Sequence, residues 1–88
     1  MKHKIKLAQI LQQYTNDREV IEVEGSTVRE CLNDLTRKYP EIKKWVFDAN
    51  NFPLVIVLLN MEALLPSNMD RKLNANDEID LVPMIAGG

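Results

Sequence analysis

The sequence predicts an α+β fold in which a mixed sheet of roughly four to five strands packs on one main helix. Two observations carry this prediction: one amphipathic helical segment lies between strand-like segments, and the strongest strand, residues 54–59, follows it. With 88 residues, of which 45% are hydrophobic and 27% charged, the chain suits one small core. We therefore expect one folded domain over residues 1–83 and a flexible tail over residues 84–88.

The first two strands are predicted from alternating polar and apolar residues. Ile5 and Leu7 alternate with lysines, and this strand is expected to run on toward Leu11. Residues 19–24 alternate acids with aliphatic residues, and a turn-rich segment, residues 15–17, separates them from the first strand. The two strands should pair as an antiparallel hairpin.

The main helix should begin at Thr27, because Glu30 follows at the spacing of a capping box. Its apolar positions recur at steps of three and four residues, and Pro40 ends it by disfavouring helical geometry at the preceding residue. The apolar stripe consists of Val28, Cys31, Leu32, Leu35 and Tyr39.

The second half of the chain supplies the remaining elements. A short helical turn comes first, and its apolar side is expected to hold Ile42, Trp45 and Val46. Residues 54–59 should be the central strand, residues 62–65 a short return strand and residues 78–83 the last strand. In this order the first and last strands should lie in parallel, with the main helix in the connection between them. The result is the order of a β-grasp sheet curled over one helix.

Charge and composition exclude several classes of function. The formal charge is −2, from 11 basic and 13 acidic residues, so we expect no nucleic-acid partner. The longest apolar run, residues 54–59, is far shorter than a membrane span of about 20 residues, so we expect no membrane segment. No signal peptide is evident, and we expect a chain that starts at Met1. A single cysteine fits a cytoplasmic location.

The residue types that carry catalysis are too few for an enzyme's active site. The chain has one histidine and one cysteine, so we expect no catalytic residue, no metal and no bound cofactor. His3 is expected to be solvated near the N-terminus. Cys31 lies on the apolar stripe, where we expect a buried and inert thiol. Asp77 and Glu78 should be solvated in a turn.

The end of the chain is the feature that points to a function. An uncharged stretch follows the last strand and ends in a glycine pair and a carboxylate: Met84, Ile85, Ala86, Gly87 and Gly88. A slim tail of this kind can enter another enzyme, where ATP adenylates the carboxylate and a sulfur donor displaces the adenylate. The product is a thiocarboxylate, whose sulfur is a nucleophile. A frayed end without a role is the plain alternative, and the apolar residues before the glycines argue against it.

The strand at residues 54–59 predicts a docking surface on the sheet. Because one helix covers one face, the open face keeps one of two sets: Leu54, Ile56 and Leu58, or Val55, Val57 and Leu59. We assign the partner-docking patch to Val55, Val57 and Leu59. Closure of that face by residues 61–69 or by a second copy of the chain is the alternative.

Five segments together are typical of one protein family. They are residues 25–30, the helix end at residues 39–40, the strand into Asn60, residues 76–79, and residues 82–88 with their Pro-x-x-Ala-Gly-Gly end. On these segments the whole chain resembles the MoaD/ThiS-type sulfur carriers. The resemblance implies a ubiquitin-like fold, adenylation by an E1-like enzyme that uses ATP, and Gly88 as the thiocarboxylated residue. It also implies a tail threaded into the partner, formed by Met84, Ile85, Ala86 and Gly87.

The resemblance implies a carrier that serves a sulfur-accepting synthase as a co-substrate, and not an enzyme. Molybdopterin synthesis and cysteine or homocysteine synthesis stay open as pathways, whereas the chain length and residues 39–40 favour thiamine synthesis less. Two other functions also stay open. One is a ubiquitin-like modifier joined to lysines through Gly88, and the other is a non-covalent adaptor that uses only its apolar sheet face.

The chain departs from the family's pattern at two turns. Met61 follows Asn60 where relatives commonly have a glycine, and Asn76 stands where a glycine often precedes Asp-Glu. Both positions are expected to have positive φ, which asparagine tolerates and methionine does not. The turn at residues 60–61 is therefore expected to be rebuilt.

Overall fold

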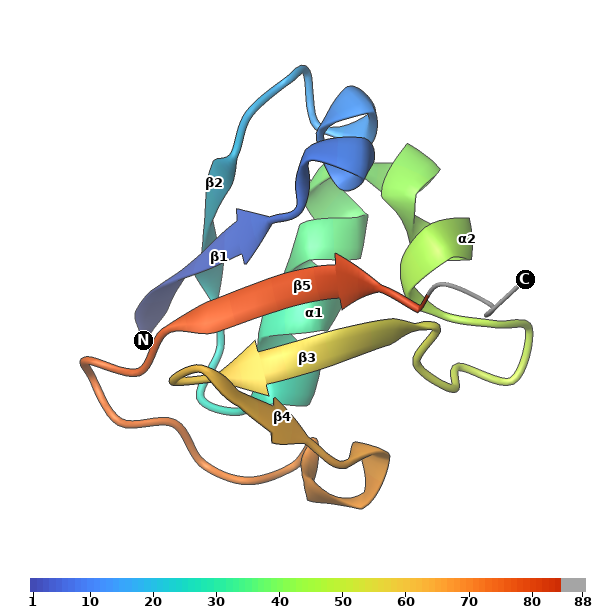
Figure 1. Ribbon diagram of the computed structural model, residues 1–88. Coiled ribbons are helices and arrows are strands. Elements are labelled where there is room, and N and C mark those ends of the chain that lie inside the picture. Colours follow the sequence, from blue (N-terminus) through green and yellow to red (C-terminus); the bar gives the residue numbers. More distant parts are fainter. Residues whose placement is uncertain (85–88) are drawn as a thin grey trace.

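A computed structural model describes residues 1–84 and shows a mixed sheet curled over one main helix (Figure 1). The strands are β1 (Lys2–Leu7), β2 (Val20–Glu24), β3 (Val55–Leu59), β4 (Glu62–Leu64) and β5 (Ile79–Pro83). The helices are α1 (Val28–Lys38) and α2 (Lys43–Val46), and the 3₁₀ segments are η1 (Gln9–Tyr14), η2 (Pro40–Ile42) and η3 (Pro66–Asn68). This architecture confirms the predicted β-grasp fold.

The sheet has the strand order β2-β1-β5-β3-β4. β1 pairs antiparallel with β2 and parallel with β5, so that Ile5 lies opposite both Ile21 and Ile79. β3 pairs antiparallel with both β5 and β4. The central strand is therefore β5 and not β3, which corrects the prediction from the apolar run. The apolar run at residues 54–59 does not mark burial on both faces, because Leu54, Ile56 and Leu58 stay partly exposed on the open face of the sheet.

α1 begins where the capping box predicts. The Glu30 amide donates to Thr27 Oγ1 at 3.1 Å, and the Glu30 carboxylate accepts from the Ser26 amide at 2.8 Å and from Ser26 Oγ at 2.9 Å. The bonds from Ser26 lower the pKa of Glu30. Before Pro40, Tyr39 leaves the helical region with a φ of −130°. The buried part of the predicted stripe packs on the sheet through Val28, Cys31, Leu32 and Leu35.

The first strand stops earlier than predicted. The chain leaves the sheet after Leu7 and winds into η1, instead of continuing toward Leu11. The reason is that Leu11 turns its side chain into the core, where it is 2% exposed. Gln12 Nε2 donates to the Leu7 carbonyl oxygen at 3.1 Å and helps to hold this turn against the strand end.

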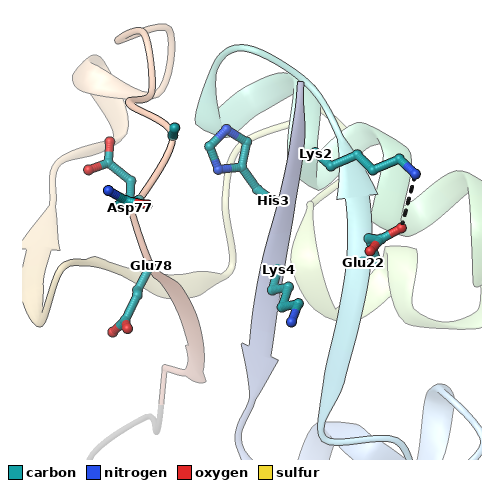
Figure 2. Close-up of a pocket in the computed structure, with 8 residues that line it drawn as sticks. Lys2, His3, Lys4, Glu22, Asp77 and Glu78 are labelled. Carbon is teal, nitrogen blue, oxygen red and sulfur yellow. Dashed lines mark ion pairs between the residues drawn. The ribbon is translucent and has the colours of Figure 1, made fainter.

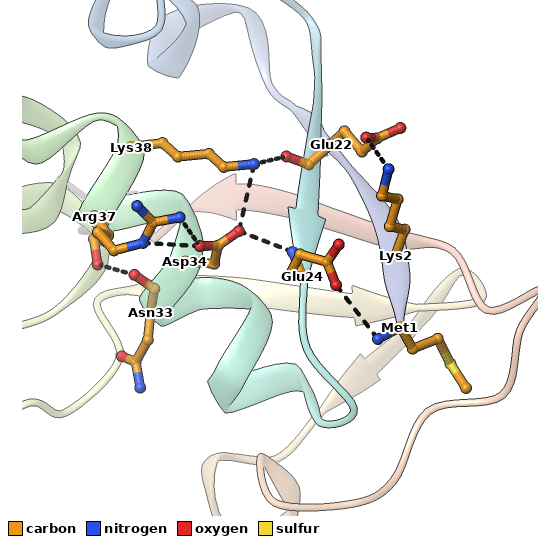
Figure 3. Close-up of polar contacts among 9 residues, drawn as sticks. Met1, Lys2, Glu22, Glu24, Asn33, Asp34, Arg37 and Lys38 are labelled. Atoms are coloured by element: carbon orange, nitrogen blue, oxygen red, sulfur yellow. Dashed lines mark hydrogen bonds and ion pairs between the residues drawn. The ribbon is translucent and has the colours of Figure 1, made fainter.

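Asp34 joins α1 to β2 (Figure 3). Its Oδ2 accepts the Glu24 amide at 2.8 Å and lies 3.5 Å from Lys38 Nζ. Its Oδ1 accepts Arg37 Nε at 3.0 Å and Arg37 Nη2 at 2.6 Å. The side chain is only 10% exposed. The Glu24 amide, followed by the Arg37 guanidinium, lowers the pKa of Asp34 below its ordinary value.

We expect Asp34→Asn to lower the free energy of unfolding by about 1 kcal/mol at neutral pH, because the charge-assisted bonds are lost. The folded-state pKa lies below the ordinary value of 3.8, so this stabilisation is complete above that pH and is lost as the pH falls through the folded-state value. The gap between wild type and variant should therefore close as the pH falls below the ordinary value of 3.8 and through the lowered folded-state pKa. Urea unfolding across this range measures it, and a gap that does not change with pH would contradict the assignment.

The turn between β3 and β4 keeps its strained backbone and is not rebuilt. Asn60 and Met61 have φ values of 52° and 71°, whereas Asn76 is not among the residues with positive φ. Asp77 holds the turn: its Oδ1 accepts Asn60 Nδ2 at 2.9 Å and its Oδ2 accepts the Asn74 amide at 2.8 Å. The bond from Asn60, followed by that from Asn74, lowers the pKa of Asp77, which corrects its prediction as a merely solvated acid.

We expect Met61→Gly to raise the free energy of unfolding by about 1 kcal/mol, since glycine adopts positive φ without a steric penalty. The Met61 side chain is 76% exposed, so little packing is lost. Met61→Ala is the control because it removes the same exposed side chain and keeps the Cβ atom. Thermal unfolding of the three proteins measures the effect, and equal stability of the glycine and alanine variants would refute it.

Candidate functional site

The described part of the chain ends just after β5, close to residues of η1 and α2. β5 carries the chain to Pro83 and Met84, on the side of the molecule where α2 lies (Figure 1). Met84 is 52% exposed. The residues predicted to form the reactive end, Ile85, Ala86, Gly87 and Gly88, lie outside the described residues. Their assignment stays a prediction.

An apolar groove of about 790 Å³ borders Met84. Its lining residues carry no charge: Ala8, Ile10, Leu11, Gln13, Tyr14, Trp45, Leu54, Val82, Pro83 and Met84. They come from η1, from α2, from the approach to β3 and from the end of β5. No sequence pattern brings these segments together, so the sequence did not predict this groove.

Trp45 lies in this groove and not in the core. The sequence predicts Ile42, Trp45 and Val46 on one buried side of a helical turn, but only Ile42 and Val46 are buried. Trp45 is 46% exposed, and its ring stacks on Tyr14 with a distance of 5.5 Å between ring centroids. The helix that carries it is a single short turn, which is too short to define an apolar face by periodicity.

The predicted docking patch was assigned to the wrong face of β3. Val55, Val57 and Leu59 are 3%, 2% and 6% exposed, because they point toward α1 and form part of the core. The open face instead carries Leu54 and Ile56, both 39% exposed, and the partly buried Leu58. Ile56 lies opposite Val82 on β5, so the apolar surface continues across the two strands. A run of aliphatic residues has the right alternation for either face, and only packing selects one.

His3 is buried, which overturns the prediction of a solvated side chain. It occupies the inward row of β1 together with Ile5 and Leu7 and is 3% exposed. Neither Nδ1 nor Nε2 has a hydrogen-bond partner within residues 1–84. His3 lines a cavity of about 240 Å³, where its ring points toward the segment that carries Asp77 and Glu78 (Figure 2). The alternation of β1 could have predicted this burial, since His3 lies two residues before Ile5 and therefore on the same face of the strand.

We expect His3→Leu to raise the free energy of unfolding by about 1 kcal/mol near pH 7.5, because an apolar side chain replaces a buried imidazole that has no hydrogen-bond partner among the described residues. His3→Ala is the control for packing and should be destabilised, since it opens a cavity. Urea unfolding compares the three proteins. A leucine variant less stable than wild type would show that the imidazole makes a favourable interaction at this site.

The lone cysteine has no features of a nucleophile. Cys31 is fully buried, as predicted, and burial raises the pKa of its thiol to about 11, with a further contribution from Glu30. Within the described part of the chain, no group of three or more histidine, cysteine or acidic residues is placed to hold a metal ion. Over the same residues, no helix has the length and hydropathy needed to cross a membrane.

Comparisons with known proteins agree with this geometry. The family model described as the ThiS family matches residues 5–88. Small archaeal modifier protein 1 from Haloferax volcanii is 25% identical with a TM-score of 0.84, and the match covers 100% of both chains. A chain of the BexX/CysO complex from Amycolatopsis orientalis is 23% identical with a TM-score of 0.77, covering 97% of this chain and 98% of that one.

One further match is a chain of the complex of subunits 1 and 2 of molybdopterin-converting factor from Helicobacter pylori. It is 18% identical with a TM-score of 0.66, and the match covers 100% of both chains. At this identity the likeness shows a shared fold. No curated protein matches the sequence.

Proposed function

This chain belongs to the ThiS family, and from this premise we propose that it is a sulfur carrier protein that acts through Gly88. The observation that carries the proposal is the route of the chain. The central strand β5 leads to an exposed, uncharged end beside an apolar groove, and the sequence beyond Met84 finishes in Gly87 and Gly88. An end of this kind presents a carboxylate to another enzyme without a side chain in the way.

The proposed chemistry has two steps at the Gly88 carboxylate. A carboxylate oxygen attacks the α-phosphate of ATP on an E1-like enzyme, pyrophosphate leaves, and an acyl adenylate forms. Hydrosulfide from a sulfide donor then attacks the acyl carbon and AMP leaves; loss of the proton from sulfur gives the thiocarboxylate, in which a C–S bond replaces the C–O bond to phosphate. The carrier itself is a co-substrate. Its folded domain supplies the surface that the partner enzymes recognise, and its glycines keep the reacting carbon accessible.

The acceptor of the sulfur is proposed to be a synthase of molybdopterin synthesis or of cysteine or homocysteine synthesis, with thiamine synthesis a weaker candidate. The likeness to chains of the BexX/CysO complex and of the molybdopterin-converting factor complex supports a protein partner of this kind. Because activation uses ATP, we place the carrier in the cytoplasm.

Incubation with ATP, a sulfide donor and the E1-like enzyme should raise the intact mass by about 16 units, as sulfur replaces one oxygen at Gly88. Deletion of Gly88 or extension of the chain by one serine should abolish this mass change, because the reacting carboxylate is lost or displaced. Circular dichroism provides the control that both variants are folded. A mass change that persists in the extended chain would refute the role of Gly88.

A ubiquitin-like modifier is the second candidate, supported by the 25% identity to small archaeal modifier protein 1. The same activation would then end in an amide bond between Gly88 and a lysine of another protein. Conjugates of higher mass that disappear when Gly88 is deleted, without any thiocarboxylate form, would favour this function. A third candidate, a non-covalent adaptor, would keep its activity after deletion of Gly87 and Gly88.

A further inference from the structure

One edge of the sheet is formed by β2, which pairs only with β1. The residue before β2, Glu19, accepts the Leu7 amide of β1 with its carbonyl oxygen at 2.8 Å. Since backbone groups alternate between the two sides along a strand, the even-numbered residues of β2 turn their amide and carbonyl groups outward. These residues are Val20, Glu22 and Glu24. A row of outward backbone groups is a template for pairing with a strand of another chain.

Two side chains of α1 occupy this outward edge (Figure 3). Asp34 Oδ2 accepts the Glu24 amide at 2.8 Å, and Lys38 Nζ donates to the Glu22 carbonyl oxygen at 2.8 Å. Asp34 and Lys38 are four residues apart on one face of the helix, with 3.5 Å between Oδ2 and Nζ. They therefore bond to two of the groups that a neighbouring strand would use, and they lie where its backbone would run, about 4.8 Å from β2.

The partner that fits an open β2 edge is β2 of a second copy of this chain. In an antiparallel pair around a two-fold axis, the outward amides of each copy meet the outward carbonyl groups of the other, so the edge is complementary to itself. With Glu22 at the axis, the pair would need the Glu24 amide and the Glu22 carbonyl oxygen, the two groups that α1 already holds. Charge also opposes this pair, because the acidic side chains of the two strands would lie side by side, and salt screens that repulsion.

We propose that Asp34 and Lys38 close the β2 edge to strand addition and thereby keep this chain from pairing edge to edge with a second copy. This inference is independent of the proposed function, since neither residue belongs to the tail or lines the groove beside Met84. The opposite edge strand, β4, has only three residues, and a very short edge offers little backbone for pairing. β2 has five residues with regular alternation, so it is the edge that needs to be closed.

The test removes the two side chains that close the edge and leaves the backbone of β2 unchanged. We expect Asp34→Ala/Lys38→Ala to dimerise, so that the mass from light scattering rises by about twofold with protein concentration. The buffer contains about 0.5 M salt to screen the acids of β2. The matched control, Arg29→Ala/Asp70→Ala, also removes one acid and one base, and it breaks a 2.9 Å ion pair that does not involve β2. Wild type and control should stay monomeric.

A third substitution tests whether the dimer forms through β2. Glu22→Pro, added to the double variant, removes an outward amide that β1 does not use, and it should restore the monomer. Because this substitution also removes an acid, charge repulsion cannot be the reason for the restored monomer. The proposal is overturned if the double variant has the same mass as wild type, or if its association persists with the proline.

Should the double variant not fold, Lys38→Ala alone is compared with Lys44→Ala, which removes an exposed lysine of α2 instead. With both chains labelled with ¹⁵N, we expect the amide signals of residues 20–24 to shift or broaden as the concentration of Lys38→Ala rises, and to stay unchanged in Lys44→Ala. Signals that respond alike in the two variants would overturn the proposal.

Discussion

The pairing of β5 between β1 and β3 is the interaction on which the rest of this structure depends. It places Ile79 and Leu81, which are 1% and 0% exposed, at the centre of the core under α1. It also means that the chain leaves the sheet from a strand that is hydrogen-bonded along both edges. Met84 therefore follows a strand that is paired with β1 as far as Leu81 and with β3 as far as Pro83.

The same pairing divides the open face of the sheet. Toward β1 and β2 the outward residues are lysines and glutamates that face one another across the strands. Toward β3 the outward residues are aliphatic, and Ile56 and Val82 lie opposite each other there. The apolar half continues into the groove beside Met84.

Two unfavourable local features lie at the other pole of the sheet. His3 is near the start of β1, and Met61 follows β3, whose last residue pairs with Ile79 at the start of β5. Both are therefore remote from Met84, which follows the end of β5. At this end of the sheet, the Asp77 carboxylate accepts hydrogen bonds from the Asn60 side chain and the Asn74 amide, and so joins the turn after β3 to the segment before β5. The fold tolerates a strained methionine here, and an imidazole without a hydrogen-bond partner within residues 1–84, because the surrounding strand pairing and hydrogen bonds hold their backbone in place.

Features that depend on a few neighbouring residues could be predicted from the sequence alone. The cap at Thr27, the end of α1 before Pro40 and the alternation of the strands follow from local hydrogen bonds and sterics. The glycine end is also legible in the sequence, as a chemical feature. The choice of the buried face of β3, and the meeting of Ile10, Trp45 and Met84 around one groove, come from tertiary packing. These features depend on segments far apart in the chain packing against one another, and no local pattern encodes that.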